Sequence, residues 1–403
     1  MKSLILSAFT AGAMLLGSPA LAQKKYDPGA SDTEVKVGNF VPYSGPASAY
    51  GIVGQTLAAY VKMVNEKGGI NGRKINLVSY DDAYSPPKAV EQTRKLVESD
   101  EVLFMYQTLG TPSNSAVMKY LNTRKVPQLM VSSGGTKFGD HKEYPWTMPF
   151  NSPYQAEGRI YAAYILKNHP NAKIAVLYPN DDYGKDIYKG IRDGLAAKTS
   201  MIVKDLTYET SDPTIDSQMV ALKGSGADLF LNLTTPKFAA MAIRKLGELK
   251  WKPVHILNNV SASTGAVIKP AGFDNAQDAI TATYVKDPTD PQFKDDPAIK
   301  EWEAFVDKYM PGGDKTNSLI LYAYAAAQVM EQIVKQAGDN LTRANIMKQA
   351  ENLKDLKVGA LMNGIVMNTS PTDHYPIEQM QLMRFKGERW EMFGELLEGK
   401  LTD

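Results

Sequence analysis

Small hydroxyl and glycine residues gather in three loops, each of which follows a short apolar run typical of a β-strand. The loops span residues 44–51, 107–114 and 132–136. Small residues let the backbone approach a ligand, and N–H groups at the start of a helix favour a carboxylate. A single Ser, Thr or Gly is equally typical of turns and helix caps. The three loops together predict a binding site for a small carboxylate.

Patterns for catalysis, metal binding or nucleotide binding are either missing or in the wrong context. Residues 85–88 match S-x-x-K, but the prolines at 86 and 87 favour a helix start with Ser85 as its cap. Residues 68–72 are rich in glycine but follow a predicted helix, where a phosphate loop does not belong. Four scattered histidines lack the spacing of metal ligands. We therefore predict no enzyme activity, no metal site and no cofactor.

The elements that position these loops repeat as strand, loop and helix. Residues 35–40 alternate as a strand, residues 51–67 have apolar positions at helical spacing, and residues 75–80 alternate again. Such a unit makes parallel strands with a right-handed crossover. In an open parallel sheet, the ligand crevice lies beyond the carboxyl ends of the strands. Further strands at 102–106 and 126–131, with a helix at about 115–123, would place all three loops at one edge.

The second half of the sequence repeats this arrangement. Predicted strands at 173–178, 228–233 and 255–257 lead into polar loops, so two facing α/β lobes are expected. Residues 317–337 form a long helix that contains Tyr322 and Tyr324, and a buried core helix is favoured over a stacking surface. Two final strands are predicted to turn at Lys386-Gly387.

The first 22 residues read as a secretory signal peptide. A basic start, an apolar run from Leu4 to Leu16 and the motif Ala20-Leu21-Ala22 predict cleavage after Ala22. No other segment reaches eighteen apolar residues, so we expect a soluble mature protein. The chain has 45 basic and 44 acidic residues, which argues against nucleic acid as a partner. Cysteine is absent, which excludes disulfides.

Several segments, in this order, resemble the periplasmic substrate-binding proteins of ABC importers, in the branched-chain amino acid (Leu/Ile/Val) binding class. They are Ser44-Gly45-Pro46 with Tyr50-Gly51, then residues 65–73, Tyr80-Asp81-Asp82, Pro127 with residues 132–136, and Asp181-Asp182-Tyr183-Gly184. The resemblance implies a type I periplasmic binding protein fold, with a doubly wound, mainly parallel sheet in each lobe. It also implies three hinge crossovers, near Phe150, Val285 and Gly364. The expected N-terminal lobe is then 23–150 and 286–363, and the C-terminal lobe is 151–285 and 364–403.

The resemblance also implies where the ligand lies. Tyr50 would pack on it from the first lobe, the loops after two strands would hold its carboxylate, and Tyr183 would close over it from the second lobe. The complete set of expected ligand-binding residues is Tyr50, Gly110, Thr111, Ser133, Gly134, Thr136, Tyr183, Thr234 and Asn259.

One departure from the family bears on the ligand. Amino-acid binders of this class pair the ligand ammonium with an acidic side chain of the second lobe, whereas Asn258-Asn259 aligns there in this chain. An ammonium without a carboxylate in a closed cleft is poorly compensated. This difference favours an aromatic or aliphatic acid over an amino acid. Residues 368–377 also resemble members of the class linked to aromatic-acid uptake.

The resemblance implies an extracytoplasmic solute-binding component of an ABC importer. It would capture a branched-chain amino acid or an aromatic or aliphatic acid between its lobes and deliver it to an ABC permease in the inner membrane. A periplasmic monomer is expected. The alternative is a domain of the same fold that senses a ligand for a signalling receptor.

Overall fold

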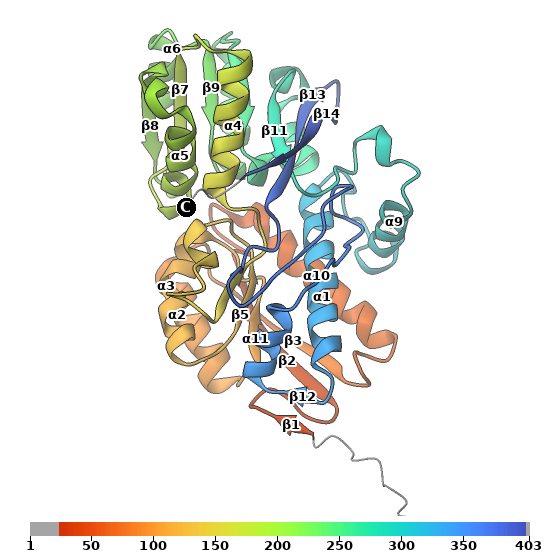
Figure 1. Ribbon diagram of the computed structural model, residues 1–403. Coiled ribbons are helices and arrows are strands. Elements are labelled where there is room, and N and C mark those ends of the chain that lie inside the picture. Colours follow the sequence, from red (N-terminus) through yellow and green to blue (C-terminus); the bar gives the residue numbers. More distant parts are fainter. Residues whose placement is uncertain (1–23, 400–403) are drawn as a thin grey trace, which may run out of the picture.

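The computed structural model describes residues 24–399 and shows two α/β lobes stacked end to end (Figure 1). The predicted signal peptide and its cleavage site lie outside the described residues. Among the helices within this range, none is both long and apolar enough to span a bilayer.

The first lobe is built on a sheet of five parallel strands in the order β3, β2, β4, β5, β6. The strands are β2 (Glu34–Val41), β3 (Lys74–Asp81), β4 (Phe104–Tyr106), β5 (Gln128–Val131) and β6 (Thr147–Pro149). Its helices are α1 (Gly51–Glu66), α2 (Pro86–Arg94), α3 (Thr111–Thr123), α10 (Ser318–Ala337) and α11 (Arg343–Ala350). The apolar positions at helical spacing in α1, including Val53, Leu57 and Val64, are all buried, so the sequence pattern has a direct physical cause.

The second lobe is built on a seven-stranded sheet in the order β14, β13, β11, β10, β9, β7, β8. Its strands are β7 (Ile174–Pro179), β8 (Ile202–Tyr208), β9 (Leu229–Asn232), β10 (Val254–Leu257), β11 (Ile280–Thr283), β13 (Gln379–Lys386) and β14 (Arg389–Glu398). Only β13 and β14 run antiparallel to their neighbours. The helices are α4 (Tyr154–Asn168), α5 (Asp182–Leu195), α6 (Asp216–Gly224), α7 (Pro236–Glu248) and the short α8 (Lys269–Ala271). The predicted two-lobed architecture with mainly parallel sheets is confirmed.

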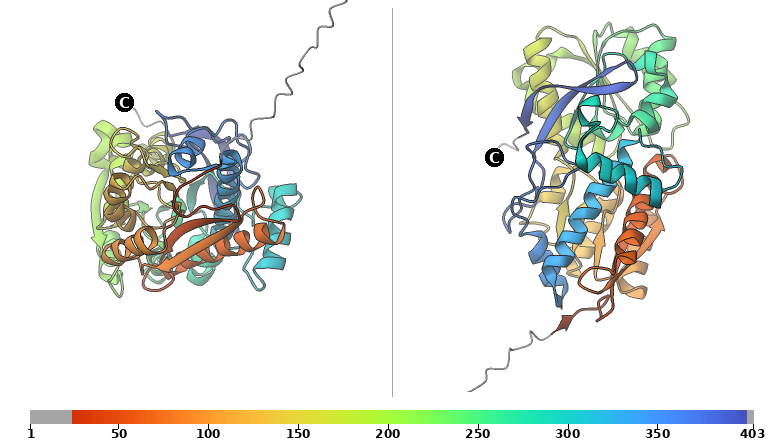
Figure 2. Two further views of the ribbon diagram at one scale, coloured as in Figure 1. Left: turned by 90° about the horizontal axis from the view of Figure 1, so that it is seen from below. Right: turned by 90° about the vertical axis from the view of Figure 1, so that its right-hand side faces the viewer.

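Three smaller elements complete the described chain. Strand β1 (Lys25–Tyr26) pairs with β12 (Asn340–Leu341) beneath the first lobe (Figure 1). Helix α9 (Pro297–Tyr309) lies against α1, and the hydroxyl of Tyr309 donates to Oε2 of Glu66 over 3.0 Å. Figure 2 shows that the hairpin of β13 and β14 lies on the second lobe, although α9, α10 and α11 precede it in the chain.

Some element boundaries differ from the predicted ones. Helix α3 begins at Thr111 rather than near Ser115, since Pro112 occupies its first turn, where the missing N–H costs nothing. Ser85 does stand at the N-cap of α2, but its side chain makes no capping hydrogen bond. The hairpin loop is Gly387-Glu388, one residue later than predicted, and Gly387 takes the positive φ of 62° that the turn needs.

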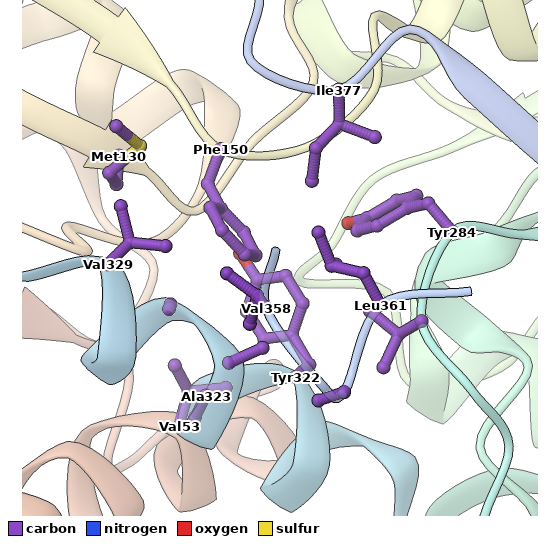
Figure 3. Packing of buried hydrophobic residues seen from close by; sticks show 14 of the residues in the cluster. Val53, Met130, Phe150, Tyr284, Tyr322, Ala323, Val329, Val358, Leu361 and Ile377 are labelled. Atoms are coloured by element: carbon purple, nitrogen blue, oxygen red, sulfur yellow. The ribbon is translucent and has the colours of Figure 1, made fainter. Parts of the chain in front are cut away.

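The chain passes between the two sheets in three places, and aromatic side chains pack where these passages meet. Phe150 follows β6, Tyr284 follows β11 and Tyr322 lies on α10. The ring of Phe150 meets Tyr322 edge-on at 5.3 Å and Tyr284 at 6.5 Å between centroids (Figure 3). Leu361 and Ile377, from the third passage, lie beside them (Figure 3). The passages therefore share one apolar core.

The third passage keeps contact with the first lobe beyond Gly364. The hydroxyl of Thr369 donates to the carbonyl of Ala350 over 2.6 Å, and that of Tyr375 donates to the carbonyl of Thr136 over 2.5 Å. Ring nitrogen Nδ1 of His374 lies 2.8 Å from the carbonyl oxygen of Thr147. We therefore propose to move this lobe boundary from 364 to the start of β13, and we keep the other two predicted boundaries as proposals.

Candidate ligand-binding site

A cavity of about 70 Å³ lies between the two lobes, at the carboxyl ends of their parallel strands. This volume exceeds the roughly 10–15 Å³ that one water molecule needs by the same measure, so the cavity holds several waters or a compact ligand. Its walls come from loops of both lobes, from the start of α10 and from the second passage, residues 283–287. This is the position expected for a ligand in facing open sheets.

The start of α3 forms the wall contributed by the first lobe. Gly110 stands at the N-cap with a φ of +103°, and no side chain caps the helix. A Cβ at Gly110 would lie 2.7 Å from the ring of Tyr84, so only glycine fits there. The hydroxyls of Thr111 and Ser133 share a hydrogen bond of 2.7 Å next to this helix start. The wall therefore presents backbone N–H groups and hydroxyls, which suit a carboxylate.

Tyrosine dominates the rest of the lining. Tyr154 and Tyr183 meet edge-on, with 4.8 Å between ring centroids. The hydroxyl of Tyr50, in the first lobe, donates to the carbonyl of Val260 in the second lobe over 3.4 Å. On α10, the hydroxyl of Tyr322 donates to Oδ1 of Asn151 over 2.7 Å. The tyrosines that line the cavity are Tyr50, Tyr84, Tyr154, Tyr183, Tyr284 and Tyr322. Rings with polar tips favour a ligand with an apolar body.

Charged groups enter the lining only from the second passage, among the described residues. Lys286 is the single cationic residue of the lining, but its ammonium donates to Oδ2 of Asp296 and to the carbonyl of Gly359 over 2.7 and 2.8 Å. It is thus already neutralised. Asp287 also lines the cavity and is 3% exposed, and burial raises the pKa of its carboxyl to about 6.

A second buried acid supports the loop that carries Asn259. Oε1 of Glu157 accepts hydrogen bonds of 2.8 Å from the backbone N–H of Asn259 and from the hydroxyl of Tyr161. Burial raises the pKa of Glu157 to about 7, although both donors act in the opposite direction. Glu157 therefore fixes a loop of the cavity wall from behind.

The structure brings five of the nine predicted residues to the cavity lining: Tyr50, Gly110, Thr111, Tyr183 and Asn259. Two others lie directly behind it. Ser133 is bonded to Thr111, and Thr234 donates from its hydroxyl to Oδ1 of Asn232 over 2.7 Å, while its neighbour Thr235 lines the cavity. Sequence position alone could not decide which member of each Ser-Ser or Thr-Thr pair faces inward.

Gly134 and Thr136 also lie away from the cavity. A Cβ at Gly134 would lie 2.2 Å from the carbonyl oxygen of Ser152, so this glycine permits the close packing that seats Tyr154. Thr136 faces the outer edge of the cleft. Its backbone N–H and its hydroxyl donate to Oδ2 of Asp186 on α5, over 2.7 and 2.8 Å. Beside it, Lys137 and Asp182 form an ion pair of 2.7 Å. We call Thr136, Asp186, Lys137 and Asp182 together the cleft-edge contacts.

The asparagines expected at the ligand ammonium donate from their amide nitrogens within the protein, whereas Oδ1 of Asn258 is buried without a hydrogen-bond partner. Asn258 donates from Nδ2 to the carbonyl of Thr234 and to the hydroxyl of Tyr183. Asn259 donates from Nδ2 to the carbonyl of Ala282 over 2.7 Å. Neither side chain is an acid, so neither could neutralise an ammonium.

Sequence reasoning missed four of the tyrosines. Tyr84, Tyr154 and Tyr284 were not singled out. The helix with Tyr322 and Tyr324 was assigned to the core. This prediction is correct for Tyr324, whose ring packs against those of Tyr60 and Phe305. Tyr322 belongs to the core and to the cavity wall at once. The one available signal was its position about one turn into the predicted helix 317–337.

The two lobes with mainly parallel sheets and the tyrosine-lined cavity between them define a binding protein that encloses a small ligand. A model of the periplasmic binding protein family matches residues 34–389, and the chain belongs to that family. The predicted family and its type I fold are thus confirmed.

Relatives and solved structures agree with this assignment. The chain is 25% identical over 347 residues to Leu/Ile/Val-binding protein homolog 7 of Brucella suis, covering 83% of this chain and 84% of that one. It is 27% identical to homolog 1 of Brucella abortus over 77% of this chain and 81% of that one. A branched-chain amino acid ABC transporter structure from Thermus thermophilus with bound valine superposes with a TM-score of 0.82 at 16% identity, covering 92% and 97%. A fatty acid ABC transporter substrate-binding protein from Thermomonospora curvata gives 0.77 at 21% identity, covering 93% and 95%.

Proposed function

We propose that this protein is the solute-binding component of an ABC importer, which captures a small carboxylate in the periplasm and delivers it to a membrane permease. It acts as a monomeric binding protein rather than as an enzyme. The observation that carries the proposal is the composition of the cavity wall: an uncapped helix start at Gly110 and Thr111 on one side, and six tyrosines around it.

The wall chemistry selects the ligand class. The ammonium of Lys286 is committed to Asp296, so a ligand anion has to be met by N–H groups and hydroxyls near the start of α3. Hydrogen bonds to a charged group contribute roughly 1.5–3 kcal/mol each, so three or four suffice for micromolar binding. The apolar faces of the tyrosines accept an aliphatic or aromatic body. The names of the relative and of the two similar structures mention Leu/Ile/Val, bound valine and fatty acid. Each of these is a carboxylate with an apolar body.

Lobe closure is the mechanism that couples capture to delivery. The bond between Tyr50 and Val260 and the cleft-edge contacts all join the two lobes. Ligand in the cavity touches both lobes only when they are closed, so binding shifts the population toward the closed form. A permease that docks on the closed surface then receives only loaded protein.

The test is a thermal-unfolding screen of the mature chain against amino acids, aliphatic acids and aromatic acids, each paired with its primary amide. A ligand at 100 times its dissociation constant stabilises the native state by about 2.7 kcal/mol. We expect at least one acid to raise the melting temperature while its amide does not. If no acid has an effect, or if amides act as strongly as acids, the proposed carboxylate site is wrong.

A further inference from the structure

Tyr183 brings an unused hydrogen-bond donor to the cavity wall. It lies in the first turn of α5, lines the cavity and is 2% exposed. Its oxygen accepts from Nδ2 of Asn258, and no acceptor for its own hydrogen occurs among residues 24–399. Burial raises the pKa of this hydroxyl well above its ordinary value, so the hydrogen stays in place. The second lobe therefore offers a donor that only a group outside the described chain can use.

A third group fixes the direction of the bond between Asn258 and Tyr183. Nδ2 of Asn258 also donates to the carbonyl of Thr234, over 2.9 Å. A reversed amide would place Oδ1 against this carbonyl oxygen, and neither atom carries a hydrogen to share. Oδ1 therefore faces away from it and is buried without a partner. Asn258, which is fully buried, thus occupies the acceptor side of the Tyr183 hydroxyl and leaves its hydrogen free for a ligand.

This donor lies close to the start of α3. The rings of Tyr183 and Tyr154 meet edge-on, with 4.8 Å between their centroids. Burial raises the pKa of Tyr154 to about 12, although hydrogen bonds that involve Ser133 and Thr111 lower it. Tyr154 therefore contacts the helix start on one side and Tyr183 on the other. A ligand whose carboxylate lies at the start of α3 meets Tyr183 with a group only a few atoms from that carboxylate.

The group that meets Tyr183 has to be an acceptor, and the charges of the cavity favour an uncharged one. Lys286, the single cation of the described lining, is committed to Asp296. Asp287, whose Oδ1 already accepts from the backbone N–H of Thr289, adds a buried carboxyl that would repel a second anion. An ammonium has no lone pair, so it would leave the hydrogen of Tyr183 unsatisfied in a buried site. A carbonyl oxygen accepts this hydrogen and brings none of its own.

We propose that Tyr183 selects oxo acids, which carry a carbonyl oxygen a few atoms from the carboxylate, over the parent acids and over amino acids. This inference rests on the proposed function and narrows its substrate class. The carboxylate binds at the start of α3 in the first lobe, and the oxo oxygen accepts from Tyr183 in the second lobe. One small ligand then bonds to both lobes, which it can do only in the closed form.

The experiment is calorimetric titration of the wild type and of Tyr183→Phe with matched ligand sets. Each set contains an oxo acid, the parent acid and the corresponding amino acid: 4-methyl-2-oxopentanoate with 4-methylpentanoate and leucine, 3-phenyl-2-oxopropanoate with 3-phenylpropanoate and phenylalanine, and 4-oxopentanoate with pentanoate and 4-aminopentanoate. For the wild type, we expect at least one oxo acid to bind roughly tenfold or more tightly than both other members of its set, because only the oxo acid satisfies the buried donor. Tyr183→Phe should abolish the advantage over the parent acid while it retains binding of the parent acid.

Tyr188→Phe is the matched control, because Tyr188 lies further along α5 and its hydroxyl donates to Asp205, outside the cavity lining. It should keep the wild-type preference. If no oxo acid reaches this advantage in the wild type, or if Tyr183→Phe keeps it, the inference is wrong while the carboxylate site stands. If the wild type binds no member of any set, the proposed function itself fails. A thermal-unfolding curve for each variant separates loss of binding from loss of folding.

Discussion

Thr136 of the first lobe donates two hydrogen bonds to a single carboxylate oxygen of Asp186 in the second lobe, from its backbone N–H and from its hydroxyl. The other oxygen of Asp186 accepts from Nε2 of Gln155 over 2.7 Å, which holds the carboxylate in place. The pair lies outside the cavity, so it acts on closure without touching the ligand.

Replacing Asp186 by Ala should weaken ligand binding, because it removes hydrogen bonds that stabilise the closed state. Loss of two charge-assisted hydrogen bonds at a partly exposed site costs about 1–2 kcal/mol, or roughly a five- to thirty-fold higher dissociation constant. Calorimetry measures the affinity, and small-angle scattering measures the closed fraction. Asp193→Ala is the control, since Asp193 lies on the same helix but pairs with Lys189 within the second lobe. Equal affinity for Asp186→Ala and wild type would show that these contacts do not favour closure.

Gly110→Ala should abolish binding. The new Cβ would collide with the ring of Tyr84, and the φ of +103° would add strain of roughly 1–3 kcal/mol. Gly226→Ala serves as the control, because Gly226 has a φ of +75° with no atom near its would-be Cβ. Both variants should lower the melting temperature, but only Gly110→Ala should lose ligand. Wild-type affinity in Gly110→Ala would remove the start of α3 from the site.

Tyr50→Phe should reduce affinity modestly without destabilising the ligand-free protein. The change removes the bond to the carbonyl of Val260 across the cleft and keeps the ring in the wall. A neutral hydrogen bond contributes about 1 kcal/mol, which corresponds to roughly five-fold in the dissociation constant. Tyr60→Phe removes a bond that stays within the first lobe, from the Tyr60 hydroxyl to a carboxylate oxygen of Glu331, and should leave affinity unchanged. Equal effects of the two substitutions would contradict a role for Tyr50 between the lobes.

Glu157 predicts a specific dependence of stability on pH. Its pKa is about 7 in the folded protein and near 4.5 when unfolded, so between these values the folded state retains a proton that the unfolded state has lost. The free energy of unfolding therefore falls as pH rises through this window, by an amount on the order of 2–3 kcal/mol. Denaturant titrations of the ligand-free protein at pH 4.5 to 7.5 measure the slope.

Glu157→Gln removes this titration and keeps the acceptor for Asn259. The difference in unfolding free energy between variant and wild type should grow in favour of the variant as pH rises. A difference that stays constant across the window would mean that Glu157 titrates normally in the folded protein.

The sequence was sufficient to predict the architecture because its signals are periodic and local. The spacing of Val53, Leu57 and Val64 defines the buried face of α1, and the order of polar loops after strands defines the cleft. The lining was harder to predict. Tyr84 reaches the cavity because Ala83 and Tyr84 both adopt a positive φ, of 49° and 59°. Neither residue is a glycine, so the sequence did not indicate this turn. Tyr322 enters the wall because α10 packs against Phe150 of the first passage, a contact between segments that lie far apart in the sequence.

The antiparallel hairpin of β13 and β14 has a consequence for the order in which the protein can be made. Strand β11 lies at the edge of its sheet until β13 pairs with it, and β13 is synthesised only after α9, α10 and α11. An emerging chain therefore carries an open strand edge for the whole time that the rest of the first lobe is being translated. Open edges recruit other strands, so such a chain is prone to aggregate. Strands β13 and β14 cover this open edge. Any protein truncated before residue 379 should therefore depend on chaperones to avoid aggregation.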